Sequence, residues 1–133
     1  MAIYRNLERV FSIVDFSATH DQLLLRSMRS GEFENNIDIL IKGVSRIILP
    51  TLLEGLEISI LNDDNKIKFL QENYSFNIDN DNRIFLIRDG TNNKYFINAY
   101  CFGVFHNKLD ILETSIGRYD YESLGEMQLW YAE

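Results

Sequence analysis

Apolar and polar residues alternate in short segments along most of this 133-residue chain. The clearest example is 36–42, where Ile37, Ile39 and Ile41 share one face and Asp38 and Lys42 lie on the other. A period of two is typical of a half-buried β-strand. Similar alternation, or a short apolar run, predicts strands at 9–16, 22–28, 36–42, 46–49, 56–61, 83–88, 94–104 and 109–114.

Turn-forming residues separate these predicted strands. Residues 89–93 read Asp-Gly-Thr-Asn-Asn, which tolerate left-handed turn conformations and predict a hairpin between 83–88 and 94–104. Strands joined by tight turns favour an antiparallel sheet. We therefore expect a mainly β, at most α+β, single domain over 1–133: an antiparallel rolled sheet or sandwich with one or two short helices.

Residues 63–73 fit two patterns. Ile67, Leu70 and Tyr74 have helical spacing, whereas Ile67 and Phe69 alone fit a strand. We favour a short helix here, because Asp63 or the acid after it is able to cap its first turn.

A second short helix is predicted after Arg118. Ser123 and Glu126 have capping-box spacing before Leu129 and Trp130, although an intervening glycine weakens this helix.

Composition and charge limit the possible functions. Hydrophobic residues make up 46% of the chain and charged residues 25%, as in a globular domain. The net charge of −7 opposes binding to nucleic acid and to anionic membranes. Residues 109–133 carry −5 of this charge.

The expected location is the cytoplasm. The N-terminal residues interrupt any apolar run with Arg5, Glu8 and Arg9, so we expect no secretory signal. No apolar run approaches the ~20 residues that span a bilayer. The lone Cys101 allows no intrachain disulfide, which fits a reducing compartment.

A polar segment at 15–21 is one candidate site. Its hydroxyls, imidazole and carboxylates are the groups of a nucleophile, a base and an orienting acid, or of a ligand-binding loop. Turn residues of these types more often bond their own backbone, so we assign no catalytic residue. The candidate binding residues, including one on the next strand, are Asp15, Ser17, Thr19, His20 and Arg26.

Metal and cofactor chemistry has little support in the sequence. His20 and His106 are far apart and belong to no Cys/His cluster. The run 79–82 lacks the glycine and glutamate of a calcium loop and predicts a polar turn. Cys101 fits a buried apolar position better than a reactive thiol activated by His106. We predict no metal and no cofactor.

A second candidate site is the C-terminal stretch, where aromatic residues alternate with acids. Aromatic anchors inside an acidic rim suit an interface with a basic protein, although the same rings are able to close the core instead. The candidate interface residues are Tyr119, Tyr121, Glu122, Glu126, Trp130 and Tyr131.

Several segments together resemble a family of small uncharacterised bacterial proteins. They are SATHDQLLLRS at 17–27, NIDI at 36–39, GV at 43–44 ahead of LP at 49–50, and LDILETS at 109–115. The resemblance covers much of the chain and implies one intact domain of bacterial type. It carries no assigned activity and lends no catalytic residue.

Three functions remain open. The leading hypothesis is a non-enzymatic interaction module, of which an immunity or antidote protein that neutralises a basic toxin is one form. The second is a small-molecule-binding or hydrolytic domain that uses the loop from Asp15 to Asp21. The third is a homo-oligomer joined through an exposed sheet edge or the aromatic tail.

Overall fold

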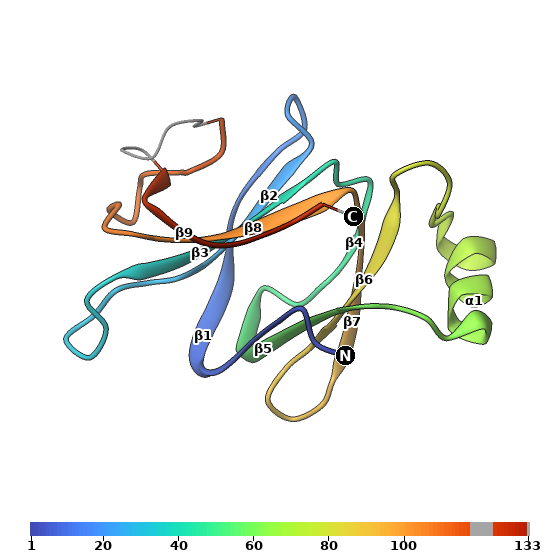
Figure 1. Ribbon diagram of the computed structural model, residues 1–133, viewed down its shortest axis with the longest axis horizontal. Coiled ribbons are helices and arrows are strands. Elements are labelled where there is room, and N and C mark those ends of the chain that lie inside the picture. The colour runs from blue at the N-terminus through green and yellow to red at the C-terminus, as the bar shows by residue number, and fades with distance from the viewer. Residues whose placement is uncertain (118–123, 133) are drawn as a thin grey trace.

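The computed structural model describes residues 1–117 and 124–132 (Figure 1). The protein is mainly β, as the sequence predicts. Its elements in chain order are β1 (Tyr4–Ser17), β2 (Gln22–Ser27), β3 (Asn36–Lys42), β4 (Arg46–Ile48), β5 (Leu52–Ile60), α1 (Asp64–Tyr74), β6 (Arg83–Arg88), β7 (Lys94–Ala99), β8 (Cys101–Asn107) and β9 (Glu126–Tyr131).

All of these strands belong to one antiparallel open sheet, with the order β4-β7-β6-β5-β1-β2-β3-β8-β9. The long strand β1 joins the two halves by pairing with β5 on one side and β2 on the other. Its register shifts between Asn6 and Val10 and again between Ile13 and Asp15. Such bulges bend a strand and increase its twist, which allows the sheet to roll.

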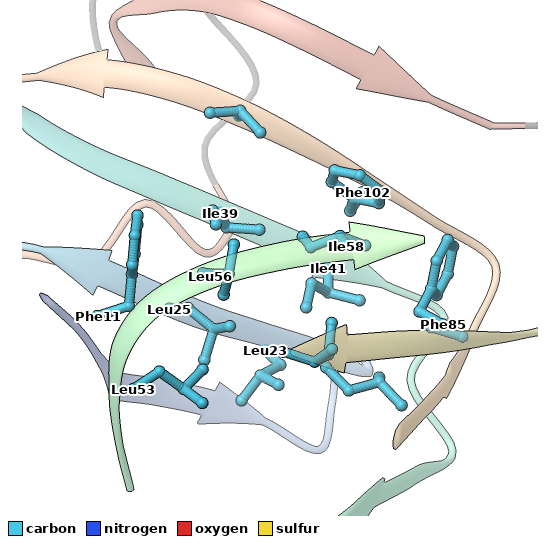
Figure 2. Packing of buried hydrophobic residues seen from close by; sticks show 14 of the residues in the cluster. Phe11, Leu23, Leu25, Ile39, Ile41, Leu53, Leu56, Ile58, Phe85 and Phe102 are labelled. Atoms are coloured by element: carbon cyan, nitrogen blue, oxygen red, sulfur yellow. The ribbon is translucent and has the colours of Figure 1, made fainter. Parts of the chain in front are cut away.

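The core lies inside this roll. The inward residues of β2, β3 and β8 form one cluster with those of β5 and β6 (Figure 2). Phe85 on β6 meets Phe102 on β8 edge to face, with ring centroids 5.4 Å apart. Each large apolar side chain that is fully buried contributes about 1.5–3 kcal/mol, so this cluster is the main source of stability.

A bend divides the predicted strand 94–104 into β7 and β8 at Tyr100. Opposite this bend, Gly43 separates β3 from β4 and has a φ of +67°, a conformation that favours glycine. The backbone N–H of Tyr100 donates to the carbonyl of Lys42 at 3.0 Å. The two strand pairs β3–β8 and β4–β7 thus form one bent ribbon, whose corner we call the Gly43–Tyr100 corner.

Helix α1 confirms the prediction for 63–73. The side chain of Asp63 caps it by accepting hydrogen bonds from the backbone N–H groups of Asn65 and Lys66. Leu70 is the buried residue of the helix and packs against the outer face of β6 and β7. The helix therefore covers the outside of the roll near β6 (Figure 1).

The hairpin predicted between 83–88 and 94–104 is present over 83–99, with Arg88 opposite Lys94 and Asp89 at the start of the turn. The polar turn at 79–82 is also present, since the N–H of Asn82 donates to the carbonyl of Asp79. No helix in the described residues is long and apolar enough to cross a membrane.

At the C-terminal end, one predicted element is wrong and another is wrong in part. Residues 109–114 form a turn rather than a strand, in which the N–H of Glu113 donates to the carbonyl of Asp110. The predicted second helix is wrong at Leu129 and Trp130, which lie in strand β9, whereas Leu124 is helical. Its first part, 118–123, lies outside the described residues.

Candidate functional site

The polar segment 15–21 covers the end of β1 and the connection from β1 to β2. The Ser17 hydroxyl accepts a hydrogen bond from the backbone N–H of His20 at 3.3 Å, so the bond between these two residues does not involve the imidazole. Asp15 is partly buried in β1, and Thr19 is exposed at the turn. This is the local turn bonding that the sequence favours over a catalytic arrangement.

Arg26 does not join this loop as a binding group. Its side chain is fully buried and makes a two-pronged ion pair with Asp38 across β2 and β3, at 2.6 and 2.9 Å. Its third nitrogen, Nη1, donates to the backbone carbonyls of Glu113 and Asp110 at 2.7 and 3.3 Å. Arg26 therefore fixes residues 109–113 to the outer face of the sheet.

Asn107 extends this buried network to β8. Its Nδ2 donates to the second carboxylate oxygen of Asp38 at 2.9 Å and to the carbonyl of Leu124 at 3.2 Å. Its Oδ1 accepts from the side chain of Asn36 at 2.9 Å. The network thus positions the chain directly before strand β9.

Three of the six predicted interface residues, Glu126, Trp130 and Tyr131, lie on β9. The other three, Tyr119, Tyr121 and Glu122, lie outside the described residues.

The two aromatic residues of β9 have different roles. The Tyr131 ring lies 6.0 Å from the rings of Phe85 and Phe102, so it closes one end of the core. The Trp130 ring lies on the opposite face, above Gly103, with the Lys42 ammonium 5.4 Å from its centroid. Trp130 is still 42% exposed. Of these two rings, that of Trp130 is the more exposed to solvent.

Strand β9 is also an edge of the sheet. Within residues 1–117 and 124–132, it pairs with β8 and with no other strand. Met127 is 42% exposed, like Trp130, and the strand contains no Lys or Pro, residues that commonly prevent pairing at a sheet edge. An exposed edge offers backbone N–H and C=O groups to another strand.

A second surface of interest lies at the Gly43–Tyr100 corner. It is a cleft of about 480 Å³, which we call the corner cleft. Two segments that are distant in sequence meet there, namely the β1–β2 connection and the loop after α1. The residues that line the cleft are Phe16, Asp21, Gly43, Val44, Ser45, Arg46, Ser75, Asn77, Asn82 and Tyr100.

One buried side chain holds the far wall of this cleft. Asn98 on β7 is fully buried, and its Nδ2 donates to the carbonyls of Asn77 and Arg83 at 2.7 and 2.9 Å. Its Oδ1 accepts from the backbone N–H of Asn77 at 2.8 Å. Two of these hydrogen bonds join the Asn98 amide to Asn77 and so attach the loop 75–82 to the sheet, and the third reaches Arg83 at the start of β6. The sequence did not reveal this role, because an asparagine in an apolar strand carries no sign of its partners.

The single cysteine is partly buried near two cations. Burial raises the pKa of the Cys101 thiol, and the positive charges of Lys42 and Arg83 only partly oppose this effect. The thiol is therefore mostly protonated at neutral pH, as expected for an unreactive cysteine. Among the residues that the structure describes, no three His, Cys, Asp or Glu side chains gather in a way that could hold a metal ion.

No family model, curated protein or solved structure matches this chain. The resemblance to small bacterial proteins stays a prediction.

Proposed function

We propose that the protein is a non-enzymatic interaction module that binds a basic protein partner along strand β9. One observation carries this proposal: in the described part of the chain, β9 is an edge strand that pairs on one side only. An extended segment of a partner is able to add to such an edge and form main-chain hydrogen bonds.

The side chains of β9 supply specificity for this mode of binding. Met127 and Trp130 are each 42% exposed, and aromatic and methionine residues are enriched in protein interfaces. Trp130 is held by Gly103 beneath it, where a Cβ would lie 2.6 Å from the indole ring. A ring fixed in this way loses little conformational freedom when a partner covers it, which favours affinity.

The charge of the chain favours a basic partner. The net charge is −7, and the acids of 109–133 exceed the single arginine there by five. Opposite charge speeds encounter and excludes partners of like charge. Two copies of this chain repel each other, which makes a basic partner a better occupant of β9 than a second copy. An immunity or antidote protein that neutralises a basic toxin is one form of this function.

Site-specific photo-crosslinking in the native host tests the proposal. A photoreactive amino acid replaces exposed Gln128 on β9 in one variant and exposed Lys68 on α1 in the control. We expect one basic protein to crosslink at position 128 and not at 68. The absence of any crosslink specific to position 128 would contradict the proposal, and a crosslink to another copy of the chain would replace it with a homo-oligomer.

Matched variants then test the mode of binding with the partner so identified. Met127→Lys places a cation at the edge, and Glu126→Lys reverses a charge there. The controls are Leu52→Lys and Glu54→Lys, which alter exposed positions on β5. We expect each β9 variant to weaken binding by about tenfold or more and the controls to leave it unchanged. If the β9 variants and the β5 controls weaken binding equally, then β9 is not the contact with the partner.

A further inference from the structure

The corner cleft is separate from the outer edge of β9, and its lining is both polar and aromatic. Phe16 and Tyr100 both line it, and they are 45% and 47% exposed. Aromatic rings left half exposed in a cleft are suited to pack against an apolar surface of a ligand.

The Tyr100 ring is fixed in position. A Cβ on Gly43 would lie 2.4 Å from two atoms of this ring, so the ring rests directly on the glycine backbone. The backbone N–H of Tyr100 is bonded to Lys42, and its carbonyl accepts from the Arg83 guanidinium at 2.7 Å. The ring is therefore a rigid platform at one side of the cleft.

Uncharged polar side chains line the same cleft as this platform. The Asn77 side chain uses its Oδ1 to accept from the N–H of Asp79, and the Asn82 side chain uses its Nδ2 to donate to the carbonyl of Asp79. The Nδ2 of Asn77 and the Oδ1 of Asn82 are bonded to no group in the described residues. One is a donor and the other an acceptor, so the cleft offers both kinds of group.

The charges that line the cleft balance. Asp21 contributes one carboxylate, and Arg46 contributes one guanidinium. The guanidinium is held by the carbonyls of Tyr74 and Ser45 at 3.1 and 2.8 Å. Local neutrality gives no preference for an anion or a cation, and it favours an uncharged ligand.

The frame of the cleft is ordered in the free protein. Asn98 fixes the loop 75–82, and the carbonyl of Asp21 accepts from the N–H of Val44 at 2.9 Å, which ties the β1–β2 connection to the corner. A ligand therefore does not have to order the backbone when it binds. The volume of about 480 Å³ falls within the usual range for small-molecule sites.

We infer that the corner cleft binds a neutral carbohydrate of one or two sugar rings. A sugar ring presents a face of C–H groups that packs on an aromatic ring, and a rim of hydroxyls that both donate and accept hydrogen bonds. The C–H face would pack on Tyr100 and Phe16. The hydroxyls would form hydrogen bonds with Asp21, Asn77 and Asn82.

The test is a ¹H–¹⁵N NMR titration of the full chain with a fixed panel of sugars. The panel contains glucose, galactose, mannose, N-acetylglucosamine, maltose, cellobiose and lactose, with glutamate and AMP as charged comparisons. We expect at least one sugar to give saturable shifts at the amides of Gly43, Ser45, Asn82 and Tyr100. No saturable shift with any sugar, or shifts only with glutamate or AMP, would overturn the inference.

Three variants and a control make the result specific. Asp21→Asn, Asn82→Ala and Tyr100→Leu each remove one recognition group, and we expect each to weaken the bound sugar by about fivefold or more. Phe69→Leu changes an aromatic residue of similar exposure on α1 and should leave binding unchanged. If Tyr100→Leu does not fold, Asp21→Asn and Asn82→Ala still test whether the cleft binds the sugar. Unchanged binding in both would contradict the inference.

Discussion

The ring of Tyr100 occupies the space that a side chain at position 43 would need, since a Cβ on Gly43 would lie 2.4 Å from two ring carbons. Gly43 also has a positive φ of 67°. These two residues form the corner at which β3 continues into β4 and β7 continues into β8. The corner cleft lies directly beside them.

Gly43→Ala should lower the free energy of unfolding by about 2–4 kcal/mol, because it combines an unfavourable φ with overpacking against the ring. Urea denaturation measures this change. Gly31→Ala is the control, since a Cβ there has no atom within 4 Å and its φ is not positive. We expect the control to stay within about 0.5 kcal/mol of the original protein. A Gly43→Ala protein of unchanged stability would contradict this account of the corner.

Asp38→Asn should cost about 3–5 kcal/mol, because it leaves the fully buried guanidinium of Arg26 without its counter-charge. Asp110→Asn breaks the exposed ion pair with Arg29, whose atoms are 2.8 Å apart, and should cost less than about 1 kcal/mol. Chemical denaturation of the two variants side by side gives the comparison. Similar losses in both would show that the buried network does not carry the stability assigned to it.

Asn98→Ala should loosen the loop 75–82, because it leaves the backbone N–H and C=O of Asn77 unpaired. We expect a stability loss of about 2 kcal/mol or more and faster amide hydrogen exchange at residue 77. Asn73→Ala removes an exposed side-chain bond within α1 and should leave both quantities nearly unchanged. If exchange at 77 does not rise, Asn98 is not what holds this wall of the corner cleft.

Asp89 at the β6–β7 turn should titrate below the ordinary aspartate value of about 3.9. Desolvation acts to raise the pKa of Asp89, but hydrogen bonds from Asn93 and Thr91 outweigh it and the pKa is lowered. A carboxyl ¹³C NMR titration measures the midpoint. Asn93→Ala should move it upwards, and a midpoint at or above the ordinary value would refute the assignment.

This shift has a consequence for stability. Because the folded pKa of Asp89 lies below its unfolded value, its stabilising contribution is fully present above the unfolded pKa. That contribution is lost as the pH falls through the folded pKa. The difference in unfolding free energy between the original protein and Asp89→Asn should therefore shrink in acid, whereas a constant difference would contradict the linkage.

Most of the sheet was predictable from local pattern. The alternation of Ile37, Ile39 and Ile41 predicted β3, and the turn residues after Arg88 predicted the β6–β7 hairpin. Both signals act over a few residues, where the period of two and the turn chemistry have direct physical causes. Tertiary contacts were not needed to find these elements.

The C-terminal end was not predictable, because long-range contacts decide its structure. Residues 109–114 have apolar positions suited to a strand, yet Ile111 and Leu112 are exposed and the segment is held by Arg26 through two backbone carbonyls. Local capping signals around Glu126 favoured a helix, but pairing with β8 makes 126–131 a strand. Tertiary pairing commonly overrides such local preferences.

The candidate sites also depend partly on local sequence and partly on long-range contacts. The sequence indicated a candidate site at the polar segment 15–21. Only the fold brings Asp21 to the same cleft as Tyr100 and Asn82. Of the two predicted interface residues Trp130 and Tyr131, the first is 42% exposed on β9 and the second turns to the core. The register of β9 with β8 decides which of these two adjacent side chains faces the core.

The central claim is tested most directly by hydrogen–deuterium exchange. The free protein is compared with its complex with the basic partner that crosslinking at position 128 identifies. If the partner adds a strand to the sheet, the amides of 126–131 become protected in the complex, while those of β4 and of α1 keep their free rates. If protection falls instead on α1, on β4 or on the corner cleft and spares 126–131, then β9 is not the binding edge and the proposed function is wrong.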